Sequence, residues 1–108
     1  MTKQLSLFLE TFGDTPLLKV LEFFLTYPDF DYTKSYVAKE TGVSRVTIEK
    51  VWKHLAKADI ITKSRTLGKI EMWSLNRKSP KVKVLMQTAA RLSLGYLESL
   101  KAKATVAA

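Results

Sequence analysis

The side chains best suited to chemistry lie on one face of the segment from Ser44 to Ala58. A helix over this segment turns about 100° per residue and gathers Ile48, Trp52 and Leu55 into an apolar stripe. The opposite face and the helix start carry Arg45, Val46, Thr47, Glu49, Lys50 and Lys53. Arginine suits the O6 and N7 atoms of guanine, glutamate accepts from N4 of cytosine, and valine can touch the methyl group of thymine. We therefore predict contact with base edges in the DNA major groove for Arg45, Val46, Thr47, Glu49 and Lys50, and contact with DNA for Lys53 as well.

The polar face of this predicted helix has other possible roles besides contact with DNA. Glu49 could pair instead with Lys53, which follows four residues later on the same helix. Each polar side chain could also belong to an ordinary solvated helix surface. We assign contact with DNA first to Arg45 and Lys50.

A second group of cations surrounds a predicted tight turn at residues 67–68. Its members are Lys63, Arg65 and Lys69, with hydroxyl residues between them. Basic groups on such a hairpin can contact phosphates or enter the minor groove. Lysines on an exposed strand can also serve to block aggregation. We favour the contact with DNA.

Helix starts offer further anion-binding positions. Backbone amides at a helix N-terminus favour anions, so Ser44 and the amides beside it could hold a phosphate. Lys34, Ser35 and Tyr36 occupy the same position in the preceding helix. Ordinary helix capping is an equal alternative for these residues.

Cap signals place the helices that carry these side chains. A hydroxyl residue before a helical run accepts a hydrogen bond from the backbone at the helix start. Such residues are Thr15, Thr33, Ser44 and Ser79. They predict helices over 15–27, 33–41, 44–58 and 79–102. Gly42 supplies the positive φ that a tight turn between the second and third of these helices needs.

The segment between the last two helices is typical of a β-hairpin. We predict strands over 61–66 and 69–75, joined by the turn at Leu67 and Gly68. Two segments are ambiguous: 1–14, a short helix or a strand, and 30–32, which could add a very short strand.

The run from Val37 to Arg45, VAKETGVSR, resembles the turn of helix-turn-helix domains, with Gly42 in the turn and Val43 filling it. Continued to Ile61, the pattern is similar to small winged-helix transcription regulators of bacteria and archaea. With FGDTP upstream it looks especially like archaeal single-domain regulators. The resemblance covers about two thirds of the chain. Thr41 departs from it, because the family usually carries leucine there. The resemblance implies a mainly α fold with a small β-hairpin, and a second helix whose N-terminal part meets base edges.

The predicted last helix has two apolar stripes, and a chain of this size can hardly cover both. One stripe holds Val82, Leu85, Ala89, Leu92 and Tyr96, and the other holds Met86, Ala90, Leu94, Leu97 and Leu100. We expect a homodimer through Leu85, Ala89, Leu92, Tyr96, Leu97 and Leu100, because two-fold dimers are the commonest assemblies. Such a dimer would place two recognition helices about one DNA turn apart, which matches a palindromic site. The alternative is a monomer in which residues 1–14 cover the second stripe.

Charge is divided unevenly along the 108 residues, whose net charge is +8. Residues 1–33 contain two basic and five acidic residues, a net −3, and residues 34–108 contain sixteen basic and five acidic residues, a net +11. A polyanionic partner is the first expectation for such a chain.

We expect one domain, with an N-terminal extension over 1–14, a winged helix over 15–75 and a dimerisation helix over 79–102.

Other classes of function find little support. The chain has no cysteine, and its single histidine, His54, has no evident nucleophile or carboxylate partner. No phosphate-binding glycine loop or metal-ligand cluster is present, so we expect no enzyme, cofactor or metal. No apolar run reaches the roughly 18 residues of a membrane span. The N-terminus also lacks the pattern of a signal peptide, so we expect a cytoplasmic, nucleoid-associated protein without a membrane partner.

The sequence thus predicts a double-stranded DNA-binding protein that prefers a specific site, and we expect a transcriptional repressor. A partition adaptor or chromatin-like protein, which nucleates at a site and spreads along DNA, is the alternative. A winged helix used for protein–protein contact is a third candidate, against which the basic recognition helix argues. Binding of a small-molecule effector is a further possibility, because a pocket for one needs no sequence signature.

Overall fold

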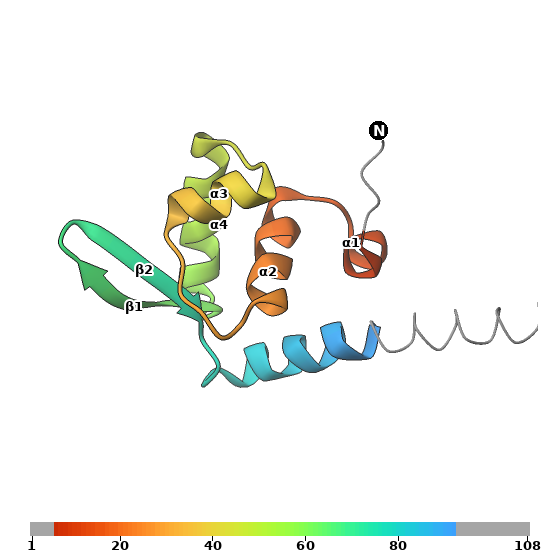
Figure 1. Cartoon of the computed structure of the whole chain (residues 1–108). Helices are drawn as coiled ribbons and strands as arrows, with labels where there is room; N and C mark the ends of the chain where they lie inside the picture. The colour runs from red at the N-terminus through yellow and green to blue at the C-terminus, as the bar shows by residue number, and fades with distance from the viewer. Residues whose placement is uncertain (1–5, 93–108) are drawn as a thin grey trace, which may run out of the picture.

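The computed structural model describes residues 6–92, which form helices, one β-hairpin and their connections (Figure 1). The elements in chain order are α1 (Leu7–Phe12), α2 (Pro16–Thr26), α3 (Lys34–Thr41), α4 (Arg45–Lys57), β1 (Ile61–Leu67) and β2 (Ile70–Leu75). A further helix begins at Pro80 and continues through Leu92, the last described residue. The architecture is mainly helical with a two-stranded antiparallel hairpin, as predicted.

Side-chain caps begin the helices at the positions that the sequence indicates. The hydroxyl oxygens of Thr15, Thr33 and Ser44 accept hydrogen bonds from backbone amides three residues later, at 3.2, 3.1 and 3.3 Å. Each bond satisfies an amide that has no partner inside its own helix. The predicted starts of α2, α3 and α4 are therefore confirmed.

The two ambiguous segments are resolved in different ways. Residues 7–12 form helix α1, which Ser6 caps and Gly13 ends, so this part of the N-terminal segment is a helix and not a strand. The strand considered over 30–32 is reduced to an isolated bridge between Tyr32 and Trp73. Their backbone groups exchange two hydrogen bonds of 2.7 and 2.8 Å.

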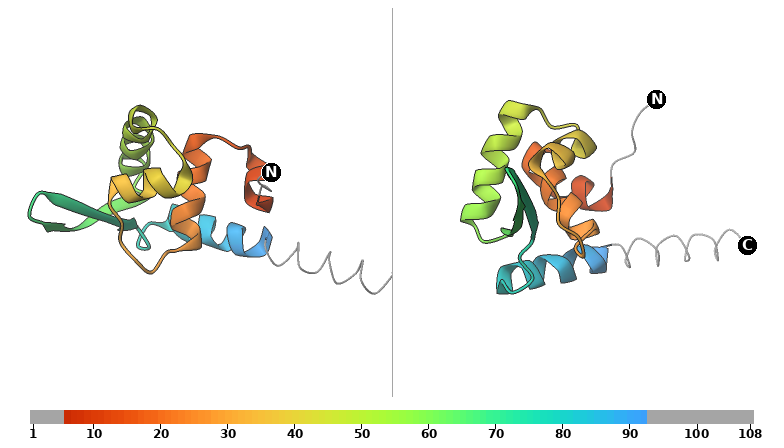
Figure 2. Two further views of the ribbon diagram at one scale, coloured as in Figure 1. Left: turned by 45° about the horizontal axis from the view of Figure 1, so that its top comes forward. Right: turned by 60° about the vertical axis from the view of Figure 1, so that its left-hand side comes forward.

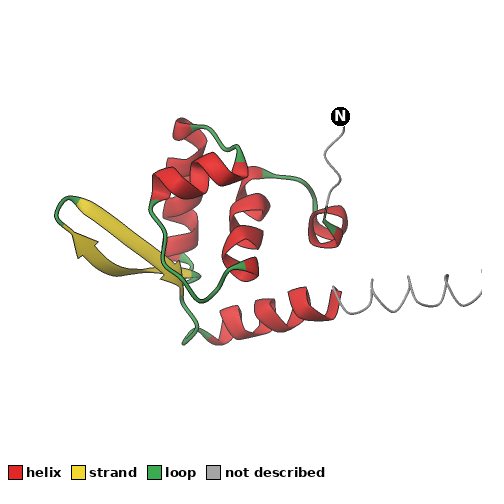
Figure 3. Cartoon of the chain, in the orientation of Figure 1, coloured by secondary structure: helices red, strands yellow, loops and turns green. Residues whose placement is uncertain are grey.

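The hairpin turn lies one residue later than predicted. Strand β1 continues to Leu67, which pairs with Ile70, so the turn consists of Gly68 and Lys69. Gly68 has a φ of +64°, and the left-handed conformation at the turn suits glycine. A register shift between Lys63 and Arg65 leaves a bulge in β1. Figure 3 shows this hairpin as the β structure of the described chain, projecting from a helical body.

Packing is centred on α2. Its buried Val20 and Phe24 belong to one core cluster with the fully buried Val37 of α3, Leu55 of α4 and Val82 of the helix that begins at Pro80. The predicted apolar stripe of α4 is confirmed, because its buried residues are Ile48, Val51, Trp52 and Leu55. Only the outward face of α4 is thereby left to solvent.

The helix that begins at Pro80 runs beneath α2, on the side away from α3 (Figure 2). Leu85, Ala89 and Leu92 are half-buried and pack against the core of their own chain. The first predicted stripe is thus partly used within one subunit, and its part in a dimer stays a prediction. Tyr96, Leu97 and Leu100, together with the end of the predicted helix at 102, lie outside the described residues. No helix within residues 6–92 combines the length and apolarity needed to span a bilayer.

Candidate nucleic-acid interface

A tight turn between α3 and α4 sets the position of the candidate recognition helix. Gly42 adopts a left-handed conformation with φ +72° and ψ +19°, and its amide and that of Val43 both donate to the carbonyl of Ala38. Val43 is buried beneath the turn. Thr41, where the resembled family carries leucine, is half-buried and donates its hydroxyl to the carbonyl of Val37 at 2.7 Å. The turn therefore keeps its geometry with a polar residue at that position.

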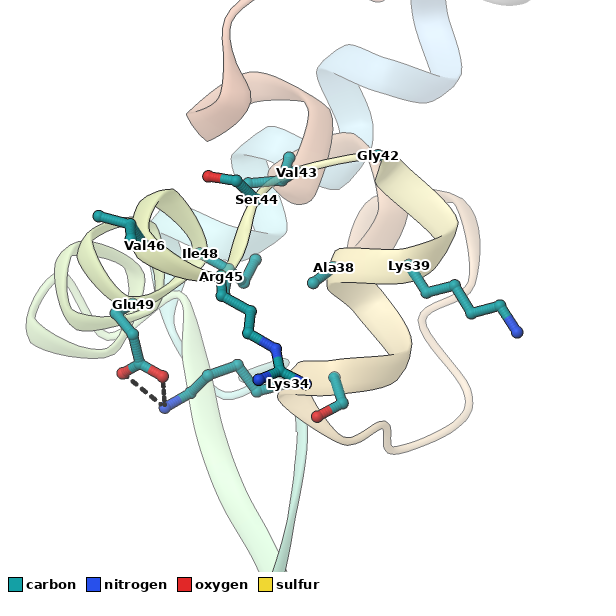
Figure 4. Close-up of a pocket in the computed structure, with 11 residues that line it drawn as sticks. Lys34, Ala38, Lys39, Gly42, Val43, Ser44, Arg45, Val46, Ile48 and Glu49 are labelled. Carbon is teal, nitrogen blue, oxygen red and sulfur yellow. Dashed lines mark hydrogen bonds and ion pairs between the residues drawn. The ribbon is translucent and has the colours of Figure 1, made fainter.

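A groove of about 740 Å³ lies between α3 and the start of α4 (Figure 4). Its lining comprises Lys34, Ser35, Ala38, Lys39, Gly42, Val43, Ser44, Arg45, Val46, Ile48 and Glu49. In Figure 4, Arg45 extends across this groove toward Lys34, while Val46 points away from the helical body. The groove thus collects several of the residues that the sequence proposes for contact with DNA.

Glu49 pairs with Lys34, and the alternative pairing with Lys53 is wrong. The ammonium of Lys34 donates to both carboxylate oxygens of Glu49, at 3.2 and 3.0 Å. The crossing of α3 over α4 brings these two residues together, so a contact between helices replaces the contact along one helix. Both side chains remain candidates for DNA contact, but in the free protein each already has a partner.

The other polar residues of α4 face solvent. Arg45, Lys50 and Lys53 are exposed and form no ion pair with any residue among 6–92. Val46 is 71% exposed. Thr47 is half-buried, and its hydroxyl accepts from Ser44 Oγ at 3.0 Å.

The first turns of α3 and α4 both line the groove that contains Arg45. Neither helix has an acidic residue in its first turn, but the carboxylate of Glu49 lies against the side chain of Lys34 at the start of α3. Ser44 acts as the N-cap of α4, which is the capping role considered for it. Ser35 and Tyr36 are exposed, and the ring of Tyr36 stacks on Tyr32 with centroids 5.7 Å apart.

The cations of the hairpin fall into two classes. Lys63 pairs with Glu71 on the opposite strand at 3.3 Å, and Arg65 pairs with Asp31 at 2.8 Å. Lys69, in the turn, is exposed and has no ion-pair partner within the described part of the chain. The three predicted wing cations are therefore not equivalent in the free protein.

Asp31 is the residue of this region that sequence reasoning missed. The Arg65 guanidinium and the Ser64 hydroxyl donate to its carboxylate, and they hold the pKa of Asp31 below its ordinary value. The same ion pair raises the pKa of Arg65. The sequence predicts only that residues 30–32 could form a very short strand, and this does not identify Arg65 as the partner of Asp31.

A metal centre finds no support in the described residues. Residues 6–92 contain no group of three or more His, Cys, Asp or Glu side chains that could hold a metal ion. His54 is exposed in the last turn of α4. The geometry thus offers an exposed cationic surface on a rigid helix and a hairpin beside it.

No protein-family model matches the sequence, and no curated protein matches it either. Solved structures do match the fold. ZitR of Lactococcus lactis, wild type in complex with DNA, is 22% identical with a TM-score of 0.55, over 84% of this chain and 64% of that chain. The PcaV transcriptional regulator of Streptomyces coelicolor, in complex with its natural ligand, is 22% identical with a TM-score of 0.54, over 93% and 74% of the two chains.

A possible transcriptional regulator from Methanosarcina mazei is 17% identical, with a TM-score of 0.56, over 85% of this chain and 77% of that chain. The chain spans 66% and 62% of the length of two further ZitR structures, slightly less than two thirds. At these identities the likeness concerns the fold. The chain therefore has the winged-helix fold that these transcription regulators share, with α3 and α4 as its helix-turn-helix and the β1–β2 hairpin as its wing.

Proposed function

We propose that this chain binds double-stranded DNA at preferred sites and regulates transcription, and that it is not an enzyme. In this proposal α4 enters the major groove, and the wing contacts the backbone or the minor groove. The observation that carries the proposal is the outward face of α4. It presents Arg45, Val46 and Lys50 to solvent, from a helix whose opposite face is fixed in the core.

The physical basis is the combination of rigidity and unpaired charge. A helix held by Ile48, Val51, Trp52 and Leu55 can present its other face in one defined orientation, as direct readout of bases requires. Free cations on that face can replace the counterions around phosphates, which is the main source of affinity for DNA. The fold that the chain shares with ZitR, solved in complex with DNA, supports the same assignment.

A homodimer on a palindromic site is the assembly that we propose. The helix that begins at Pro80 would supply the interface, through the half-buried Leu85, Ala89 and Leu92 and through Tyr96, Leu97 and Leu100 farther along the sequence. Repression by occupying a promoter in the cytoplasm is the simplest consequence. Sedimentation tests the assembly: a species of twice the 12.2 kDa chain mass is expected, and a species of 12.2 kDa at micromolar concentration would contradict it.

The test of DNA binding is selection from random duplexes, followed by binding isotherms on the selected and on scrambled duplexes at several salt concentrations. A regulator is expected to saturate one site and to prefer it by at least about 10³-fold. Of the cations that we propose for contact with DNA, four have no ion-pair partner within residues 6–92: Arg45, Lys50, Lys53 and Lys69. If all four contact phosphates, log K should fall with log salt with a slope of about −3.6 per subunit.

Two results would change the assignment. Cooperative growth beyond the first site would favour the partition or coating protein over the regulator. Absence of measurable binding to any duplex at low salt would refute both.

A further inference from the structure

Asp31 connects the wing to the helical body. It lies in the loop between α2 and α3, and its carboxylate accepts from three donors of β1. Arg65 donates from Nε at 2.8 Å and from Nη2 at 3.2 Å, and Ser64 donates from Oγ at 2.7 Å. Thirty-four positions separate Asp31 from Arg65 in the sequence. The contact is therefore a feature of the tertiary structure and not of the hairpin.

The loop that carries Asp31 is itself firmly anchored. The neighbouring Tyr32 exchanges two backbone hydrogen bonds with Trp73 of β2. Its ring packs on Phe23 of α2, with centroids 4.8 Å apart, and stacks on Tyr36 of α3. The aromatic contacts of Tyr32 hold this loop on α2 and α3, and from the loop Asp31 reaches the middle of β1.

The wing needs such a support, because a two-stranded hairpin has little stability of its own. Every residue from Thr62 to Glu71 is exposed, so no apolar packing holds the outer part of the wing. The side chain of Asp31 is only 19% exposed, whereas that of Arg65 is 57% exposed. The ion pair sits at the bulge in β1, between the buried base at Ile61 and the tip of the hairpin.

We propose that Asp31 is a positioning residue that fixes the angle of the wing by holding Arg65. The inference rests on the proposed function, because it assigns roles within DNA binding. Arg65 then supports binding through the orientation of the wing, and its charge is neutralised by Asp31. The phosphate contact of the wing falls first to Lys69 in the turn, which has no ion-pair partner within the described residues.

The wing offers a matched control in Glu71. Asp31→Asn and Glu71→Gln each remove one negative charge from an ion pair with a wing cation. The pair of Lys63 with Glu71 lies within the hairpin, whereas the pair of Arg65 with Asp31 joins the hairpin to the body. If charge alone decided affinity, both variants would bind DNA more tightly than wild type.

The positioning role predicts opposite effects for the two variants. Glu71→Gln is expected to bind a selected duplex at least as tightly as wild type. Asp31→Asn is expected to bind about two- to ten-fold more weakly, since the wing must then be ordered during binding. Asp31→Asn binding as tightly as Glu71→Gln would overturn the inference.

Variants of Arg65 provide a second test of the positioning role. Arg65→Gln is expected to weaken binding with an unchanged salt slope, and Arg65→Lys is expected to recover part of the affinity. The double variant of Asp31→Asn with Arg65→Gln should be no weaker than the worse single variant, because both changes remove one interaction. A salt slope lower by about 0.9 in Arg65→Gln would show a direct phosphate contact and would overturn the inference.

A measurement without DNA separates this inference from the proposed function. Amide hydrogen exchange at Tyr32 and Trp73 reports the attachment of the wing, through the two hydrogen bonds that join them. Both amides should exchange faster in Asp31→Asn and should be unchanged in Glu71→Gln. Equal protection in all three proteins would refute the positioning role. If wild type bound no duplex, the proposed function would fail while this measurement still tested the attachment.

Discussion

Two valines allow the same chemical change to be made at opposite extremes of exposure. Val82 is 0% exposed, at the contact between the helix that begins at Pro80 and the body, and Val46 is 71% exposed on α4. Truncation of either to alanine removes two methylene equivalents from a helix. The pair therefore separates what a side chain does for stability from what it does on the proposed DNA surface.

Val82→Ala should destabilise the fold substantially. Two buried methylene equivalents contribute about 1.6 kcal/mol at about 0.8 kcal/mol each. The cavity left behind increases the cost, and the better helix propensity of alanine returns up to about 0.5 kcal/mol. A net loss of about 2 kcal/mol corresponds to a fall in Tm of about 8–16 °C for a domain of this size. Urea and thermal denaturation followed by circular dichroism measure both quantities.

Val46→Ala should leave stability within about 0.5 kcal/mol of wild type, because an exposed side chain loses no burial. Its effect should appear on DNA. If Val46 touches a thymine methyl group, replacing that thymine by deoxyuridine should weaken wild type by roughly three- to ten-fold. Val46→Ala should be insensitive to the same replacement.

Either of two results would refute the reasoning. A fall in Tm for Val46→Ala as large as that for Val82→Ala would mean that the outward face of α4 is buried in solution. An unchanged Tm for Val82→Ala would mean that the helix beginning at Pro80 is not docked on the body.

Three further outcomes are expected. Gly42→Ala should lower the free energy of unfolding by roughly 1–2 kcal/mol, because a residue with a β-carbon is strained at the φ of +72° even though no atom lies within 4 Å of that carbon. Urea denaturation measures this loss, and an unchanged free energy of unfolding would contradict the prediction. Lys50→Ala should relax base preference at one or two positions in a selection experiment, whereas equal weakening on all duplexes would point to a phosphate contact. The lowered pKa of Asp31 means that its stabilisation is present above the ordinary value of 3.8 and is lost as pH falls through the lowered value. Wild type should therefore lose more stability than Asp31→Asn on acidification below about pH 4, and equal losses in urea denaturation would contradict this.

Features decided by neighbours in the sequence could be predicted well. The caps at Thr15, Thr33 and Ser44 need only an amide three residues away, and the turn at Gly42 needs only a residue that tolerates positive φ. The buried stripe of α4 follows from the helical repeat. Such features depend on covalent geometry over a few residues, so the chain carries them wherever it folds.

The sequence predicts less well those features that depend on contacts between different helices and strands. The hairpin turn was placed one residue early, because the pairing of Leu67 with Ile70 is decided by the register of two strands. The role of the first apolar stripe in the last helix was also open, since hydrophobic spacing does not say whether the covering surface belongs to the same subunit.

The sequence by itself determined which residues form the cationic surface, namely the outward side of α4 and the hairpin. Only the tertiary structure decided which of those charges are free. Lys34 meets Glu49 across fifteen positions, and Arg65 meets Asp31 across thirty-four. The physical reason is that two charges attract each other through space when they lie a few ångströms apart, however far apart they are in the sequence. The crossing of α3 over α4 brings Lys34 to Glu49, and the packing of the wing beside the loop between α2 and α3 brings Arg65 to Asp31. Asp31, one of the five acidic residues among 1–33, is thereby brought into contact with the wing.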